Sequence, residues 1–179
     1  MKTHIYKKEK ALSVDQCNSI IEYINDPSNC DDEQNIKIDL YSVVYDYYES
    51  TPFKFVPNIL LENLKIYQEE HLFLKNLYAP WGFENSWNLQ KYLPGQSYHE
   101  EHMEHGKTPD QCLRILAWMF YLNDVNDGGG TRFPQQNFTA KARTGDLYIW
   151  PAGWTHSHYG IVSNTETKYI ITGWCSFGK

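Results

Sequence analysis

The segment Leu113–Leu122 constrains the fold more strongly than any other part of the chain. Successive side chains of a β-strand point to opposite faces, and here both alternating sets of residues are apolar. A strand that is apolar on both faces is buried between other layers, so we expect this segment to be central in a sheet. One set consists of Leu113, Ile115, Ala117, Met119 and Tyr121, and the other of Leu116, Trp118, Phe120 and Leu122.

Shorter strand patterns and turns surround this central segment. A chain with many short strands and regular turns is typical of an antiparallel barrel or jelly roll. The glycine-rich stretch Asn126–Gly130 is one such turn. We expect the other strands over residues 36–45, 85–92, 97–104, 146–150 and 168–174.

Two helical patterns lie in the N-terminal part of the chain. The first covers residues 12–26, where Ser13 and Gln16 form a plausible capping box. The second covers residues 59–77 and follows a break that ends at Pro57. The predicted fold class is therefore mainly β with flanking helices: a double-stranded β-helix, or jelly roll, with the N-terminal helices packed on one sheet.

Length and composition predict one soluble domain over residues 1–179, with helical support over about 1–80 and a β-helix core over about 81–179. The net charge of −6 disfavours a nucleic-acid partner. No apolar run approaches the roughly 20 residues of a membrane span, so we expect a cytoplasmic protein without a membrane partner. The four cysteines show no CxxC spacing and are expected to be reduced thiols: Cys17, Cys30, Cys112 and Cys175.

Potential metal ligands are concentrated in the stretch Tyr92–Gly106, which holds three histidines and three glutamates. In an extended His102-x-Glu104 triplet both side chains point to one face, and a second histidine pair, His156 and His158, can supply a third ligand. Two histidines and one carboxylate suit non-heme Fe(II), but the same set also suits Zn(II). An earlier triplet, His99-x-Glu101, is the alternative.

Seven short motifs in a fixed order resemble the Fe(II)/2-oxoglutarate-dependent dioxygenases of the prolyl 4-hydroxylase type. Together they span residues 92–174, about half of the chain. The motifs are Tyr92-x-Pro-Gly95, His102-x-Glu104, Phe120–Asn123, Gly128–Pro134, Gly145–Leu147, His158-x-Gly160 and Lys168–Trp174.

The resemblance implies that His102, Glu104 and a distal histidine hold Fe(II). Lys168 follows His158 by ten positions and His156 by twelve, and the shorter spacing is the one that resembles the family. We therefore take His158 as the third ligand. His156 is kept as the second choice, because strand parity puts both histidines on one face and does not distinguish them. The family usually has aspartate where this chain has Glu104.

The resemblance also implies a pocket for 2-oxoglutarate, whose far carboxylate would meet Lys168. If Lys168 points into the barrel, so do the residues at every second position after it. Thr172 would then offer its hydroxyl to the same carboxylate, and Trp174 would form a wall. The other expected lining residues are Tyr92 or Tyr98, Met119 and Tyr121.

The function implied is O2-dependent hydroxylation, with ascorbate as a supporting reductant and release of succinate and CO2. The resemblance favours a prolyl residue of a peptide or protein as substrate, recognised by residues 27–56 and 105–112. Two alternatives stay open. A metal-dependent hydrolase would share the ligands, although the helical His-Glu-x-x-His motif is absent. A non-catalytic jelly-roll binding module would not need the metal.

Overall fold

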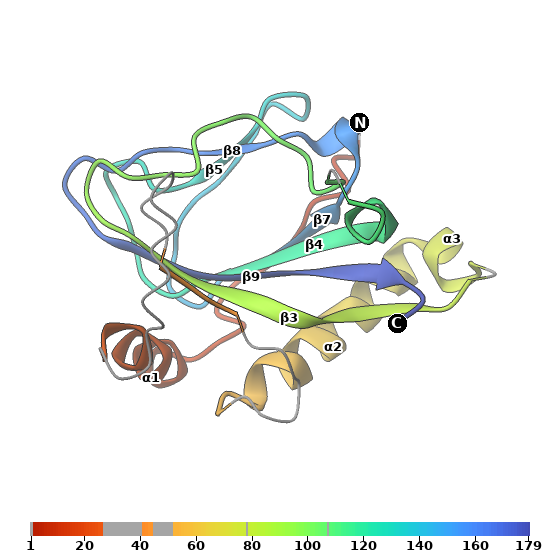
Figure 1. Ribbon diagram of the computed structural model, residues 1–179, viewed down its shortest axis with the longest axis horizontal. Coiled ribbons are helices and arrows are strands. Elements are labelled where there is room, and N and C mark those ends of the chain that lie inside the picture. The colour runs from red at the N-terminus through yellow and green to blue at the C-terminus, as the bar shows by residue number, and fades with distance from the viewer. Residues whose placement is uncertain (1, 27–40, 45–51, 78, 107) are drawn as a thin grey trace.

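The computed structural model describes residues 2–26, 41–44, 52–77, 79–106 and 108–179. Two antiparallel β-sheets face each other, and helices cover the outer face of the larger one (Figure 1). The strands are β1 (Tyr6–Lys8), β2 (Tyr41–Val44), β3 (Trp81–Tyr92), β4 (Arg114–Tyr121), β5 (Thr131–Phe133), β6 (Phe138–Ala140), β7 (Leu147–Pro151), β8 (Tyr159–Gly160) and β9 (Lys168–Phe177). The α-helices are α1 (Val14–Asn25), α2 (Phe55–Glu70) and α3 (Leu72–Lys75), and the 3₁₀ turns are η2 (Gln111–Leu113) and η3 (Trp154–His156).

The larger sheet has six strands in the order β1-β7-β4-β9-β3-β2, and the smaller has three in the order β6-β5-β8. Strand β4 lies between β7 and β9, which confirms the prediction of a central strand. The mainly β, jelly-roll architecture with N-terminal helices on one sheet is likewise confirmed. Strands β1 and β2, from the N-terminal part of the chain, form the two edges of the larger sheet.

The two faces of β4 belong to two separate hydrophobic cores. Leu116 and Trp118 lie in the core between the larger sheet and the helices, together with Ile20 of α1. Met119 lies in the core between the two sheets, together with Phe133 of β5. The alternation along β4 therefore determines which face supports the helices and which faces the interior of the jelly roll.

The helices follow the sequence pattern with two corrections, because the helix expected over residues 59–77 begins earlier than expected and is divided at His71 into α2 and α3. Helix α1 has the expected capping box, because the Ser13 side chain accepts from the Gln16 backbone while the Gln16 side chain accepts from the Ser13 backbone. Helix α2 begins at Phe55, so the expectation that Pro57 ends a break was wrong. Proline is tolerated there because the first-turn N–H groups of a helix have no partner within the helix.

The expected strand over residues 97–104 was wrong. Only His102 pairs there, in an isolated antiparallel bridge with His158. The other backbone bonds of this segment also go to residues 152–160: Gly160 N–H donates to Tyr98 O, and Glu104 N–H donates to Ala152 O. The segment thus lies beside β8, at the edge of the smaller sheet, without forming a regular strand.

Several other expectations can be compared with the described residues. Strand β2 covers residues 41–44 of the strand expected over 36–45, and the remainder lies outside the described residues. Cys17, Cys112 and Cys175 are free thiols, whereas Cys30 lies outside the described residues. None of the helices in the described part of the chain is long and apolar enough to cross a membrane.

Candidate metal centre

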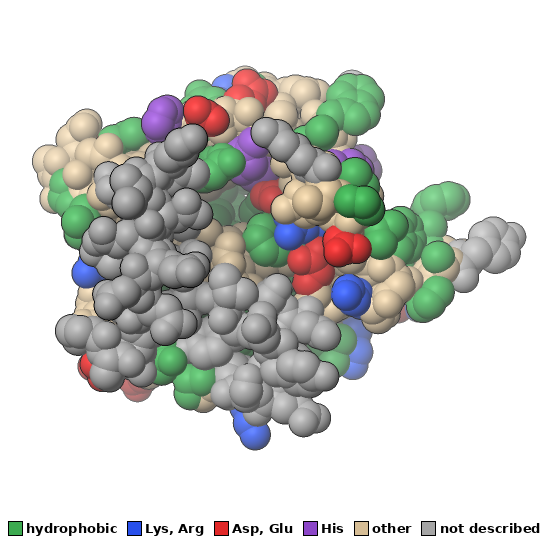
Figure 2. Space-filling view, viewed as in Figure 1, with side chains coloured by type: hydrophobic (Ala, Val, Ile, Leu, Met, Phe, Trp, Pro, Cys, Tyr) green, Lys and Arg blue, Asp and Glu red, His purple; other side chains and the backbone are tan. Residues whose placement is uncertain are grey.

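A pocket of about 1060 Å³ lies between the two sheets. It opens on the face shown in Figure 2, where histidine and acidic side chains border the hollow. Most of the residues expected at the site line this one pocket, so segments far apart in the sequence meet there. They are Tyr92, Tyr98, His102, Glu104, Met119, His158, Lys168, Thr172 and Trp174.

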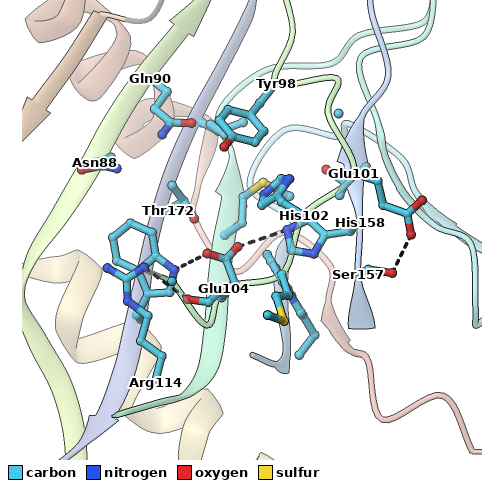
Figure 3. A pocket seen from close by; sticks show the side chains of 18 of the residues that line it. Asn88, Gln90, Tyr98, Glu101, His102, Glu104, Arg114, Ser157, His158 and Thr172 are labelled. Carbon is cyan, nitrogen blue, oxygen red and sulfur yellow. Dashed lines mark hydrogen bonds and ion pairs between the residues drawn. The ribbon is translucent and has the colours of Figure 1, made fainter. Parts of the chain in front are cut away.

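His102, Glu104 and His158 form the candidate metal centre. One potential ligand atom from each residue lies within 4.8 Å of the others. Neighbouring ligand atoms about 2.1 Å from one ion are roughly 3.0–3.4 Å apart, so metal binding would draw these three atoms together by up to roughly 1.8 Å. The two imidazoles turn toward the Glu104 carboxylate, as Figure 3 shows.

Backbone carbonyls determine which ring nitrogen of each histidine can bind a metal. His102 Nδ1 donates to Glu100 O at 2.8 Å, and His158 Nδ1 donates to His156 O at 2.9 Å. In the neutral rings Nε2 therefore carries the lone pair, and both Nε2 atoms are available to the site. Such bonds orient imidazole ligands in metal proteins.

The contact between His158 and Glu104 fits a bound cation. His158 Nε2 lies 3.1 Å from Glu104 Oε1, although both atoms are acceptors in the tautomer set by His156 O. A cation or a second proton must compensate for this arrangement. Burial by itself raises the pKa of Glu104, but His158, His102 and Trp174 together lower it to about 2. A buried carboxylate beside two imidazoles is a donor set for a divalent metal such as Fe(II).

His156, the second choice, does not meet these residues. It lies in η3, so the assumption that both histidines share one strand face was wrong. His156 Nε2 donates to Thr3 O at 2.8 Å, and Nδ1 lies 3.0 Å from Thr155 Oγ1. Both of its ring nitrogens are thus engaged away from Glu104.

The alternative triplet His99-x-Glu101 also lies apart from the candidate metal centre. His99 Nδ1 donates to Ser97 O at 3.2 Å. The Glu101 carboxylate accepts a 2.6 Å hydrogen bond from Ser157 Oγ at the pocket wall (Figure 3).

Lys168 is a buried cation at the inner part of the pocket. Its exposed fraction is 5%, and within the described part of the chain no carboxylate pairs with it. Its Nζ lies 4.4 Å from the centroid of the Tyr92 ring, and burial lowers the pKa of Lys168 to about 8. Ile170, Thr172 and Trp174 line the same pocket, as strand parity predicts. A buried cation without a counter-ion is a candidate site for an anionic ligand.

Two expected pocket residues are engaged differently. The Thr172 hydroxyl donates to Trp118 O at 3.0 Å, so its proton is not available to a ligand. Tyr121 is absent from the pocket lining, and its hydroxyl bonds to Thr131 Oγ1 at 2.8 Å and to Ala140 O. Thr131, which does line the pocket, lies within the motif Gly128–Pro134 but was not expected at the site.

Arg114 and Glu84 were not expected at the site. Arg114 lines the pocket, donates to the Glu84 carboxylate through Nε and Nη2 at 3.0 and 3.3 Å, and stacks on Trp174. By strand parity Arg114 belongs on the outer face with Leu116. An irregularity in the β4–β9 pairing between these two residues turns Arg114 inward instead. A lone arginine at the start of an apolar strand is the only signal in the sequence.

Solved structures resemble the whole chain. The viral collagen prolyl hydroxylase of Paramecium bursaria Chlorella virus 1 is 18% identical, with a TM-score of 0.69 over 98% of this chain and 97% of that one. A prolyl-4-hydroxylase of Pseudomonas putida is 16% identical, with a TM-score of 0.70 over 98% and 93%. At these identities the likeness shows a shared fold.

Sequence comparison adds the family. A mimivirus (Acanthamoeba polyphaga mimivirus) protein named "Putative prolyl 4-hydroxylase" is 36% identical in an alignment of 110 residues, and the match covers 51% of this chain and 46% of that protein. The match thus spans about half the length of this relative. The family model described as the 2OG-Fe(II) oxygenase superfamily matches residues 87–176, a region that contains all three candidate ligands and Lys168. The chain belongs to the 2OG-Fe(II) oxygenase superfamily.

Proposed function

We propose that this chain is an Fe(II)- and 2-oxoglutarate-dependent dioxygenase that hydroxylates a prolyl residue of a peptide or protein, with release of succinate and CO2. One observation carries the proposal: His102, Glu104 and His158 converge in the pocket that also holds the unpaired cation of Lys168. An Fe(II) ligand set and a site for a dicarboxylate thus share one cavity. The name of the mimivirus relative supports the choice of prolyl chemistry.

Side chains at one end of the pocket would bind the metal, and side chains at the other end would bind 2-oxoglutarate. His102, Glu104 and His158 would hold Fe(II), which together with 2-oxoglutarate and O2 supplies the oxidative chemistry. Lys168 would bind the far carboxylate of 2-oxoglutarate and thereby orient its oxo-acid end toward the metal. Met119 and the ring of Tyr92 would form apolar walls that exclude water.

The mouth of the pocket suits an extended, proline-containing chain. Trp154 is 70% exposed there and Met103 is 44% exposed, and both line the pocket. The backbone around Trp154 is held by Gln135 Nε2, which donates to Trp154 O at 3.0 Å. Proline-rich segments dock on aromatic surfaces because their extended conformation is already formed before binding. Of the two segments proposed for recognition, the first, 27–56, is described only at residues 41–44 and 52–56. From the second, 105–112, Gly106 and Gln111 line the pocket.

The direct test is turnover of 2-oxoglutarate to succinate by protein reconstituted with Fe(II) under air, with ascorbate, in the presence and absence of a proline-rich peptide. We expect succinate that requires Fe(II), rises with the peptide and is lost in His102→Ala, together with hydroxyproline in the peptide by mass spectrometry. Succinate without hydroxyproline would retain the oxygenase and remove the prolyl substrate. The absence of both succinate formation and 2-oxoglutarate binding would refute the proposal.

A further inference from the structure

A continuous series of contacts links the candidate metal ligand Glu104 to an ion pair at the pocket wall. Trp174 Nε1 donates to Glu104 Oε2 at 2.6 Å. The Arg114 guanidinium carbon lies 3.6 Å from the centroid of the Trp174 ring. Glu84 accepts from Arg114 at 3.0 and 3.3 Å, and it also accepts from Ser176 Oγ at 2.6 Å. Figure 3 shows Arg114 beside the ring that bonds to Glu104.

The two carboxylate oxygens of Glu104 face different partners. Oε1 faces His158 Nε2, whereas Oε2 accepts from Trp174. An indole N–H is a donor only, so Trp174 cannot compete for the metal as a ligand. The bond to Trp174 therefore engages one oxygen and leaves the other directed at the candidate metal centre.

Glu104 needs such a restraint more than a ligand on a regular strand would. Its segment is not a strand: the Glu104 N–H donates to Ala152 O at 3.0 Å, and the Glu104 carbonyl accepts a long 3.5 Å bond from Arg114 Nη1, which leaves the carboxylate itself unrestrained by the backbone. Compared with the aspartate that the family usually has, glutamate carries one more rotatable bond. Each additional rotatable bond lowers the fraction of side-chain conformations in which the carboxylate can bind the metal. A short, charge-assisted hydrogen bond selects one orientation.

The position of Trp174 in turn depends on Arg114. The side chains of Arg114 and Glu84 are only 13% and 15% exposed, so the pair is largely removed from water. A guanidinium is planar. Its face can stack on an indole while the N–H groups in the guanidinium plane bind a carboxylate. Lysine would retain the charge but could not combine both contacts in this way.

We propose that Arg114 is a positioning residue for the metal site: braced by Glu84, it holds the Trp174 indole so that its N–H fixes the orientation of the Glu104 carboxylate. This inference rests on the proposed role of Glu104 as a metal ligand. It requires neither 2-oxoglutarate turnover nor a prolyl substrate, because the effect is on binding of the metal itself.

The test measures Co(II) affinity by isothermal titration calorimetry without 2-oxoglutarate, in protein whose folding is checked by thermal unfolding. Trp174→Phe removes the N–H but keeps an aromatic ring, and it should raise the Co(II) Kd about tenfold, the lower end for loss of a group that supports a metal ligand. Arg114→Lys acts on Glu104 one contact further away and should raise the Kd less, roughly fivefold, which is below the range for loss of the supporting group itself. Arg143→Lys is the matched control, because the Arg143 side chain donates to Val125 O and Ala142 O and does not line the pocket, and it should leave the Kd unchanged.

The double variant Trp174→Phe/Arg114→Lys shows whether Arg114 acts through Trp174. If it does, the double variant has the Kd of Trp174→Phe alone, whereas independent effects would multiply to roughly fiftyfold. Multiplying effects, or an unchanged Kd in Trp174→Phe, would overturn the inference. Loss of Co(II) binding in His102→Ala verifies the metal site separately. If no succinate forms but the Co(II) Kd values of the variants still rank as expected, the proposed function is refuted and the inference about Arg114 stands.

Discussion

Replacing Lys168 by methionine should stabilise the ligand-free protein while abolishing 2-oxoglutarate binding. Burial lowers the pKa of Lys168 from 10.5 to about 8. At 1.36 kcal/mol per pKa unit, this shift corresponds to a destabilisation of roughly 3 kcal/mol below pH 8. The contact with the Tyr92 ring, 4.4 Å from Nζ, offsets about 1–2 kcal/mol of it. Methionine retains the apolar stem, so the net gain in the free energy of unfolding should be roughly 1–2 kcal/mol.

The lowered pKa of Lys168 determines how the free energy of unfolding changes with pH. Between pH 8 and pH 10.5 the folded protein has released the Lys168 proton, while the unfolded chain still holds it. The unfolded state then binds more protons, so the stability of the unsubstituted protein rises with pH through this window. The advantage of Lys168→Met is therefore complete below pH 8 and disappears by pH 10.5.

Urea unfolding at pH 7 and pH 10, with and without 2-oxoglutarate, measures both effects. The ligand should raise the free energy of unfolding of the unsubstituted protein and leave that of Lys168→Met unchanged. Lys141→Met, at an exposed lysine, is the control for a general effect of removing positive charge. A Lys168→Met protein that is less stable than the unsubstituted protein at pH 7, or that still binds 2-oxoglutarate, would refute the reasoning.

Three further predictions concern the metal site and the pocket mouth. His158→Ala should abolish Co(II) binding in calorimetry, whereas His156→Ala should retain it and lose stability through the missing bond to Thr3 O. Glu104→Asp, which restores the residue usual in the family, should raise the Co(II) Kd about tenfold, because the shorter side chain cannot reach both the metal and Trp174. Trp154→Ala should raise the KM for a proline-rich peptide severalfold, with little change in the KM for 2-oxoglutarate, measured as succinate formation.

The central strand of the larger sheet could be predicted because both of its faces are apolar. Both faces of β4 are apolar and both are buried, so the pattern identified a central strand without knowledge of its neighbours. Parity along β9 likewise placed Lys168 and Trp174 on one face, and both line the pocket. These features depend on the backbone of a single regular strand, which the sequence encodes locally.

Tertiary contacts decided the features that could not be predicted. The segment with His102 and Glu104 was expected to be a strand, but it lies beside β8 with only one bridge and brings both side chains to the pocket by an irregular backbone path. Parity failed for Arg114 because the pairing with β9 shifts between it and Leu116. It failed for His156 because a 3₁₀ turn replaces the expected strand. Irregular backbone of this kind is concentrated around functional sites.

The formal charges of the buried groups in the pocket suit a Lys168 that pairs with no carboxylate among the described residues. Glu104 contributes one negative charge, Lys168 one positive charge, and Arg114 and Glu84 neutralise each other, whereas Glu101 at the pocket wall is exposed to water. A divalent metal at the candidate metal centre would make this buried region doubly positive, and the dianion 2-oxoglutarate would then neutralise it. Either ligand alone leaves an uncompensated charge in a site largely removed from water, which is costly. Each ligand should therefore increase the affinity of the other by the same factor. An acidic partner for Lys168 within the chain would remove this coupling.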